Sequence, residues 1–159
     1  MNSELIKIEP VAEGDRTGVM TVMKSANMHH VPSPEVPTLD WNRFWMIKLD
    51  GKVLGASGYC VLENGDAKTT LMAVLPECKG KGYGLALQTY RMNRALAEGC
   101  QFMHTNSDIP EVIQWYKKHF NYKVVGSVAK LHEFGRPEID TWTSLRTDLE
   151  EWKHHQKGA

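Results

Sequence analysis

The sequence predicts an α/β fold in which helices flank a mixed, mostly antiparallel sheet. A glycine-rich loop, Lys79-Gly80-Lys81-Gly82-Tyr83-Gly84, joins an apolar strand pattern to a helical pattern. Before that loop, the turn signals Asp50-Gly51 and Asn64-Gly65 separate three consecutive strand patterns. After the helix, residues 101–106 read as a strand again, and a helical crossover makes this strand parallel to the one that precedes the loop.

Length and charge favour one domain and argue against two classes of partner. The chain has 159 residues and 42% hydrophobic content, so we expect one domain over 1–148, followed by a tail over 149–159. Lys plus Arg and Asp plus Glu both number 19, so no overall field attracts nucleic acid or an anionic membrane. The sequence shows neither a long apolar run nor a secretory signal pattern, so we expect a cytoplasmic protein.

The first half of the chain combines strand patterns with one helix. Four segments have the apolar content and turn boundaries of strands: 5–11, 44–49, 53–62 and 67–75. Asp15 is placed to cap a helix over about 16–29, whose packed face holds Val19, Val22, Met23 and Ala26. The stretch 29–40 contains three prolines and no periodicity, which predicts a surface loop.

The second half begins with the helix after the glycine loop. Leu85, Thr89, Met92 and Leu96 recur at helical spacing and predict its packed face, and Gly99 is placed to end it. Three more segments read as strands: 101–106, 122–131 and 139–145. Asp108 and Glu111 have the spacing of a capping box, which predicts a helix that runs through Phe120. The tail from 149 reads as a fraying helix or a disordered segment.

The glycine loop is suited to bind an anion. A helix that begins at about Gly82 presents unpaired N–H groups and the positive end of its dipole, and Lys79 and Lys81 add charge. The glycine spacing is that of neither a dinucleotide-binding fingerprint nor a P-loop. An alternative interpretation is a purely structural glycine-rich turn.

Cysteines and histidines give no pattern of metal ligands. Cys60, Cys78 and Cys100 lack metal-type spacing and fit reduced thiols, and Cys78 in the loop is expected to be accessible to alkylating reagents. The adjacent His29 and His30 could be ligands or bases, but solvated loop histidines are the simpler interpretation. We therefore expect no metal.

Two motifs resemble those of the GNAT N-acetyltransferase superfamily. Lys79 to Gly84 is similar to the family's pyrophosphate-binding signature [Q/R]-x-x-G-x-[G/A], with Lys in place of the usual Arg or Gln. The segment 115–126 resembles the family's F-Y-E-K-x-G-F-x-x-x-G segment, with one extra residue and with Asn121 where glycine is usual. Asn106 matches an asparagine that the family often has at the end of the preceding strand. These matches run from about Ala67 to Gly126.

The resemblance implies an acyl-CoA N-acyltransferase fold with splayed parallel central strands and acetyl-CoA as co-substrate. The pantetheine would bond to the main chain of Met72, Ala73 and Val74 in the opening between the two strands. The pyrophosphate would lie on the amides from Lys79 to Leu85. The residues that the resemblance implies for binding the carrier are Met72, Ala73, Val74, Lys79, Gly80, Lys81, Gly82, Tyr83, Gly84, Leu85 and Asn106.

Acyl transfer to an amine requires a neutral amine, a stabilised oxyanion and a proton for the leaving thiolate. By its place in the second motif, Tyr116 is the candidate catalytic acid, because a phenol is protonated at neutral pH. The alternative is that Tyr116 only packs on the sheet. The base stays open: His104 is one candidate, a water relay is another, and residues 29, 30, 132 and 133 also lie in segments that could line the acceptor cleft.

The resemblance implies an N-acetyltransferase that moves acetyl from acetyl-CoA to a primary amine of a small molecule by direct attack in a ternary complex. A protein or peptide amine is the alternative acceptor, and a non-catalytic acyl-CoA-binding sensor is the alternative class. The segment Glu133 to Asp140 could select substrate or form a contact in a possible homodimer.

Overall fold

The computed structural model describes residues 6–26, 39–131, 136 and 138–157. The chain divides into two compact units. The first contains Met1–Tyr59 and Thr70–Arg91, and the second contains Cys60–Thr69 and Met92–Ala159.

One seven-stranded sheet has the strand order β1-β2-β3-β4-β5-β7-β6. Its strands are β1 (Ile8–Pro10), β2 (Phe44–Leu49), β3 (Lys52–Val61), β4 (Ala67–Val74), β5 (Phe102–Ser107), β6 (Lys123–Ala129) and β7 (Thr141–Asp148). Four neighbouring pairs are antiparallel: β1 with β2, β2 with β3, β5 with β7, and β6 with β7. The ladder between β4 and β5 is parallel and joins Ala67 to Met103 and Lys68 to His104. The predicted mixed, mostly antiparallel sheet is therefore confirmed.

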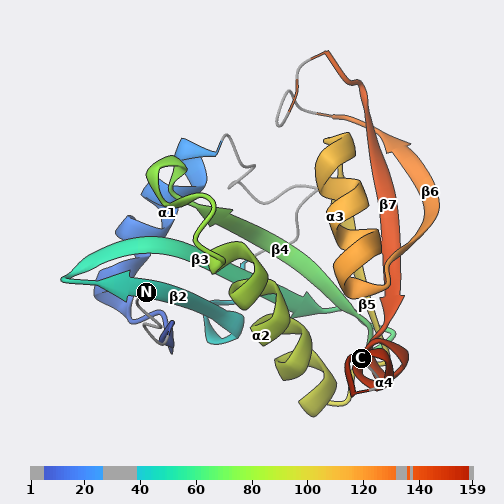
Figure 1. Ribbon diagram of the computed structural model, residues 1–159, viewed down its shortest axis with the longest axis horizontal. Helices are drawn as coiled ribbons and strands as arrows, with labels where there is room; N and C mark the ends of the chain where they lie inside the picture. Colours follow the sequence, from blue (N-terminus) through green and yellow to red (C-terminus); the bar gives the residue numbers. More distant parts are fainter. Residues whose placement is uncertain (1–5, 27–38, 132–135, 137, 158–159) are drawn as a thin grey trace. The chain divides into compact units, whose positions relative to one another are not determined.

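The first unit packs helix α1 (Arg16–Ser25) against the strands β2 and β3 (Figure 1). Val19, Val22 and Met23 are at most 1% exposed, which confirms these three positions of the predicted packed face, whereas Ala26 follows the end of the helix and is exposed. Gly58 on β3 marks a close approach, because a Cβ atom there would lie 2.8 Å from the carbonyl oxygen of Arg43 and would overlap the ring of Phe44. Only glycine fits between these two strands at that point.

The second unit places helix α3 (Pro110–Phe120) beside strands β5 and β7 (Figure 1). The hydroxyl of Thr147 on β7 donates to the carbonyl of Phe120 at the end of α3, 2.9 Å away. Asn121 then ends the helix in the left-handed conformation at φ 57°. Asparagine tolerates this conformation better than most residues, so it replaces the glycine that is usual in the resembling motif.

The tail is a helix, which was one of the two predicted alternatives, but it is packed rather than fraying. It forms helix α4 (Leu149–Lys157), in which Leu149 is completely buried and Trp152 is 1% exposed. The burial of a tryptophan and a leucine offsets the conformational entropy that a loose terminal helix would retain.

Two predicted helix caps also differ from the structure. Neither Asp15 nor Asp108 makes a side-chain capping bond to its helix. The carboxylate of Asp15 accepts a hydrogen bond from Lys48 at 2.8 Å, and this bond lowers the pKa of Asp15. Asp108 accepts from Lys130 at 2.8 Å. In both cases a cationic partner from a distant part of the chain binds the carboxylate more strongly than a local amide would.

Candidate functional site

The glycine loop connects the end of β4 to helix α2 (Tyr83–Ala97), and the first unit contains the loop and the helix as far as Arg91. The Leu75 amide donates to the carbonyl of Leu54 at 2.8 Å, and a single turn, Pro76–Cys78, follows. Gly80 and Gly82 then adopt φ values of 84° and 83°, which L side chains rarely adopt. These two glycines allow the backbone to enter the helix with its first N–H groups exposed.

The start of α2 has the electrostatics of an anion site. Its first turn contains no acidic residue, and Lys79 and Lys81 are exposed in the loop before it. The nearest acidic residue in sequence, Glu77, has its pKa lowered by a hydrogen bond from its own backbone N–H and then by Lys52. The carboxylate of Glu77 lies 3.4 Å from the Lys52 ammonium. The unpaired amides and the helix dipole at Tyr83 therefore favour a bound negative charge.

The described residues leave space beside the loop. A Cβ atom built on Gly80, Gly82 or Gly84 would meet no atom of these residues within 4 Å, apart from its chain neighbours and its own helix. This clearance fits the close approach to the main chain that a pyrophosphate group requires. The donor set of backbone amides with two flanking ammonium groups fits such a group chemically.

The end of β4 supplies the expected pantetheine-binding segment. Ala73 is 7% exposed, whereas Met72 and Val74 are half-buried. All three belong to the same compact unit as the glycine loop and the start of α2. The structure thus brings together the carrier-binding residues expected between Met72 and Leu85.

Tyr116, the candidate acid, lies on α3 in the second unit. It is 5% exposed, and its ring centroid lies 5.0 Å from that of Tyr122 and 5.2 Å from that of Trp115. These aromatic neighbours fix the direction of the phenol. They fit the packing interpretation as well as the catalytic one.

Asn106 and His104 lie on one face of β5 and already have polar partners. Oδ1 of Asn106 accepts a hydrogen bond from the hydroxyl of Ser144 at 2.9 Å. Nε2 of His104 lies 2.8 Å from a carboxylate oxygen of Asp66 in the turn before β4. The other candidate bases, residues 29, 30, 132 and 133, lie outside the described residues.

The loop cysteine differs from its prediction as an accessible thiol. Cys78 is 6% exposed and belongs to the apolar core cluster of the first unit. Its amide donates to the carbonyl of Leu75 at 2.9 Å, so the single turn directs the side chain inward. Reagents that alkylate exposed thiols should therefore reach Cys78 slowly.

The predicted face of α2 is also corrected by the structure. Leu85 is 45% exposed, and the fully buried positions are Leu87, Gln88, Arg91, Met92 and Ala95. The apolar pattern missed this face because two of its residues, Gln88 and Arg91, are polar. Gln88 and Arg91 are three residues apart and fall on the same side of the helix as Leu87 and Ala95. This spacing was the sequence signal that could have identified the buried face.

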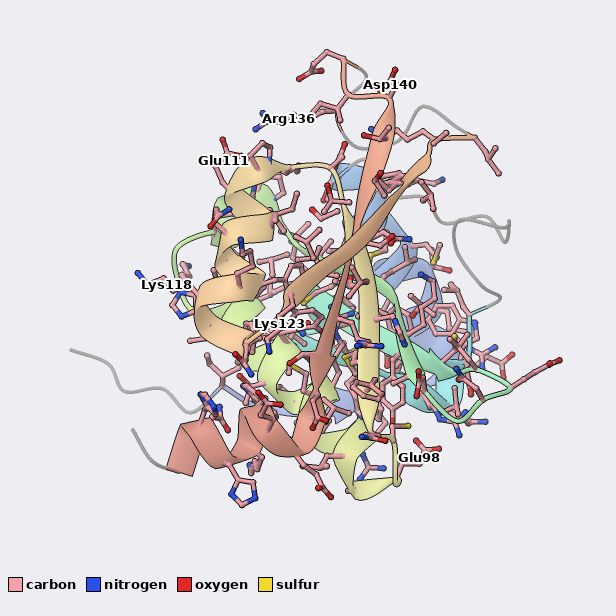
Figure 2. The ribbon with its side chains drawn as sticks, turned by 90° about the vertical axis from the view of Figure 1, so that its right-hand side faces the viewer. Glu98, Glu111, Lys118, Lys123, Arg136 and Asp140 are labelled. Atoms are coloured by element: carbon pink, nitrogen blue, oxygen red, sulfur yellow. The ribbon has the colours of Figure 1, made fainter. Side chains whose placement is uncertain are left out.

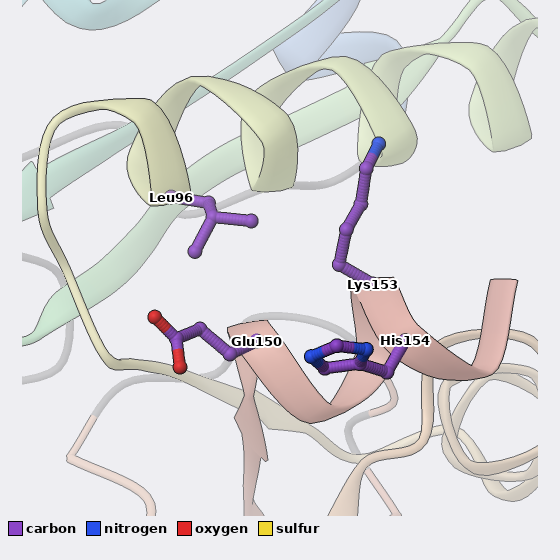
Figure 3. Close-up of a pocket in the computed structure, with 4 residues that line it drawn as sticks. All are labelled: Leu96, Glu150, Lys153 and His154. Carbon is purple, nitrogen blue, oxygen red and sulfur yellow. The ribbon is translucent and has the colours of Figure 1, made fainter. Parts of the chain in front are cut away.

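A surface pocket of about 410 Å³ lies at the other end of α2, where α4 approaches it in the second unit (Figure 3). Its lining residues are Leu96, Glu150, Lys153 and His154. The Lys153 ammonium donates to the side chain of Asn93 at 2.8 Å. This pocket contains none of the residues expected to bind the carrier.

Among the residues that the structure describes, no group of three or more His, Cys, Asp or Glu side chains is arranged to hold a metal ion. None of the helices there is both long and apolar enough to span a membrane.

Several solved structures share this fold. Ard1 from Thermoplasma volcanium matches with a TM-score of 0.73 and 15% identity, covering 89% of this chain and 96% of that one. The ribosomal-protein-S18-alanine N-acetyltransferase from Escherichia coli matches with a TM-score of 0.70 and 12% identity, covering 90% and 93%. N-acetylglutamate synthase from Neisseria gonorrhoeae, complexed with coenzyme A and N-acetyl-glutamate, matches with a TM-score of 0.69 and 16% identity, covering 93% and 36%. No curated protein matches the sequence.

The family model described as Acetyltransferase (GNAT) family matches residues 18–122. That match includes β2 to β5, α2, α3, the whole glycine loop and the second resembling motif as far as Tyr122. The chain therefore belongs to the GNAT acetyltransferase family and is an acyltransferase.

Proposed function

We propose that this protein transfers an acetyl group from acetyl-CoA to a primary amine of a small molecule by direct attack in a ternary complex. The observation that carries the proposal is the glycine loop. Gly80 and Gly82 hold positive φ, the first turn of α2 lacks acidic residues, and open space lies beside the glycines. Membership in the GNAT family supports the assignment of this loop to the diphosphate of a CoA thioester.

The carrier would be held by two stretches of main chain. Amides from Lys79 to Leu85 would bind the diphosphate, with the ammonium groups of Lys79 and Lys81 beside it. Backbone groups of Met72 to Val74 would bond to the amides of the pantetheine arm. When bound, acetyl-CoA supplies an acetyl group that is activated as a thioester.

Tyr116 would supply the proton that the departing thiolate requires. Its phenol is held by packing against Tyr122 and Trp115, which restricts the directions in which the O–H can point. Asn106 would assist in binding the carrier from the end of β5. No base is assigned: His104, whose Nε2 lies 2.8 Å from a carboxylate oxygen of Asp66, stays one candidate, and a water relay is the other.

Two other acceptor or functional classes are compatible with the family. The similar structures include enzymes whose names specify a ribosomal protein's alanine and a glutamate as acetyl acceptors, so a protein or peptide amine is the alternative acceptor. The departures from the family motifs at Lys79 and Asn121 leave a non-turnover acyl-CoA sensor as the alternative class.

Thiol release distinguishes an enzyme from a sensor. The chain is incubated with acetyl-CoA and a panel of small primary amines, amino acids, polyamines and peptides, and free CoA thiol is titrated. We expect thiol release with at least one small amine, accompanied by an acetylated product in mass spectrometry. Release with peptides only would favour the alternative acceptor. Thermal stabilisation by CoA without release from any panel member would favour the sensor.

A further inference from the structure

A seam of buried polar side chains lies between α2 and the neighbouring strands in the first unit. Ser57 and Gln88 are completely buried, and Arg91 is 1% exposed. The Ser57 hydroxyl donates to the carbonyl of Leu87 on α2, 3.3 Å away. Apolar side chains build the core cluster of this unit, and a cation is costly to bury in such surroundings. The presence of Arg91 therefore calls for a specific role.

The guanidinium of Arg91 bridges three elements. Its Nη1 donates to the carbonyl oxygen of Gly58 on β3 at 3.0 Å, and to that of Leu71 on β4 at 3.4 Å. Its Nε donates to the side-chain oxygen of Gln88, one turn earlier on α2, at 2.7 Å. Because the guanidinium is planar and rigid, these bonds fix two adjacent strands relative to the helix.

The elements that Arg91 joins are those that carry the two expected parts of the carrier site. Leu71 comes directly before the segment Met72 to Val74, which is proposed to bond to the pantetheine. Arg91 lies about 12 Å along α2 from Tyr83, where the diphosphate amides begin. All of these residues belong to the first unit.

We propose that Arg91 is a positioning residue for the CoA thioester. By tying Leu71 on β4 to α2, it sets the separation and angle between the main chain of Met72 to Val74 and the amides at the start of α2. The two parts of the site are then preorganised to bind one carrier at the same time. This inference rests on the proposed function, because it assumes that the carrier binds at both places.

A structural role alone explains Arg91 less well. An apolar side chain of similar length would also hold a helix on a sheet, and replacing buried charges by apolar residues is often neutral or stabilising. Apolar contacts do not fix the strand carbonyls in one direction, whereas the hydrogen bonds that Arg91 donates to the carbonyls of Gly58 and Leu71 do. Binding sites require this kind of directional support, because small displacements of the binding groups weaken ligands strongly.

Two probes of different length test the inference. ADP carries a diphosphate without the pantetheine arm, whereas CoA carries both, so the ratio of their dissociation constants measures how well the two parts of the site act together. We expect Arg91→Met to weaken CoA roughly tenfold or more in titration calorimetry, and to leave ADP nearly unchanged. Arg91→Lys should also lower the advantage of CoA over ADP, because an ammonium cannot reproduce the planar fork.

Val22→Ala is the matched control. Val22 is a buried residue of α1 in the same unit, so its truncation lowers stability through the core and should leave the CoA to ADP ratio unchanged. If Arg91→Lys, or a folded Arg91→Met protein, kept the wild-type ratio of the CoA and ADP dissociation constants, the positioning role would be overturned. The proposed function would not be affected by that result. Failure of the wild-type chain to bind CoA would overturn the proposed function itself, and the positioning role with it.

Discussion

At the scale of single residues, the glycine loop makes the sharpest prediction. Gly82 has a φ of 83°, and a Cβ atom there would project into open space rather than into the protein. Gly82→Ala should therefore cost about 1–2 kcal/mol of stability from backbone strain. It should also weaken CoA binding, because the methyl group and the altered backbone disturb the amides that face the diphosphate.

Gly51→Ala provides the comparison for that substitution. Gly51 has a φ of 80°, has open space around its Cβ position, and lies in the turn between β2 and β3 of the same unit. We expect a similar loss in thermal stability and an unchanged dissociation constant for CoA. Equal effects of the two substitutions on CoA binding would contradict the assignment of the loop.

Removal of the Tyr116 hydroxyl should lower turnover without weakening the binding of CoA. Tyr116→Phe keeps the ring packing against Tyr122 and Trp115 and removes only the hydroxyl, so the folded structure and the CoA affinity should persist. If the phenol protonates the thiolate, kcat should fall by about 10²–10⁴-fold. The control is Tyr122→Phe, because Tyr122 is 2% exposed and lies beside it. Undiminished turnover in Tyr116→Phe would leave the residue with a packing role only.

Lys68 predicts a dependence of stability on pH. Burial lowers the pKa of Lys68, and the nearby charge of Cys60 raises it in part. Because the folded chain holds this proton less tightly than the unfolded chain, Lys68 should destabilise the fold at neutral pH. This penalty should disappear as the pH rises from the lowered pKa toward the pKa of a free lysine.

Lys68→Met should accordingly be more stable than the wild type at about pH 7, and the difference should shrink at about pH 10. Urea midpoints at the two pH values measure the effect. Lys123→Met is the control, since Lys123 is exposed and no comparable pH dependence is expected from it. A constant difference between wild type and Lys68→Met at both pH values would show that burial of the charge is not the cause.

At the scale of elements, a buried ion pair joins Lys130, directly after β6, to Asp108, shortly before α3. The side chains of Asp108 and Lys130 are 4% and 7% exposed, and their charged atoms lie 2.8 Å apart. The same carboxylate accepts the amide of Arg136, and the Lys130 ammonium donates to the carbonyl of Arg136 at 2.9 Å. Figure 2 shows Arg136 beside Glu111 at the start of α3, and their side chains lie 3.4 Å apart.

Asp108→Asn should therefore be strongly destabilising. It removes the negative charge and leaves the Lys130 ammonium buried, for which a loss of about 3–5 kcal/mol is typical. Lys123→Met removes an exposed ion pair in which the Lys123 ammonium lies 4.0 Å from a carboxylate oxygen of Glu151. Its loss should cost less than about 1 kcal/mol of stability. Denaturant unfolding of the two variants compares them directly, and equal losses would contradict the importance of burial.

At the scale of the whole molecule, local sequence patterns predicted nearly all the elements. The strands, α1, α2 and α3 were predicted because side-chain periodicity and turn residues act within a few positions. The loop itself was found for the same reason, since glycines at 80 and 82 permit its backbone. The predicted boundaries differ from the observed ones by a few residues. For example, β7 is Thr141–Asp148, whereas the prediction was 139–145.

The errors share one physical cause, which is competition from distant partners. Asp15 and Asp108 were predicted as helix caps, but each binds a lysine far away in sequence. The packed face of α2 was predicted from its leucines. The face that contains Arg91 is buried instead, because Arg91 donates hydrogen bonds to carbonyl groups on two strands. The tail was predicted to be loose, but Trp152 is buried in the second unit.

The sequence by itself determined the order of elements, the glycine loop and the family, because each depends on residues that are close together in the chain. The tertiary structure alone decided which polar side chains are buried and which groups they bind. Hydrogen bonds and ion pairs gain strength where water is excluded, and exclusion of water results from the packing of the whole unit rather than from any local pattern.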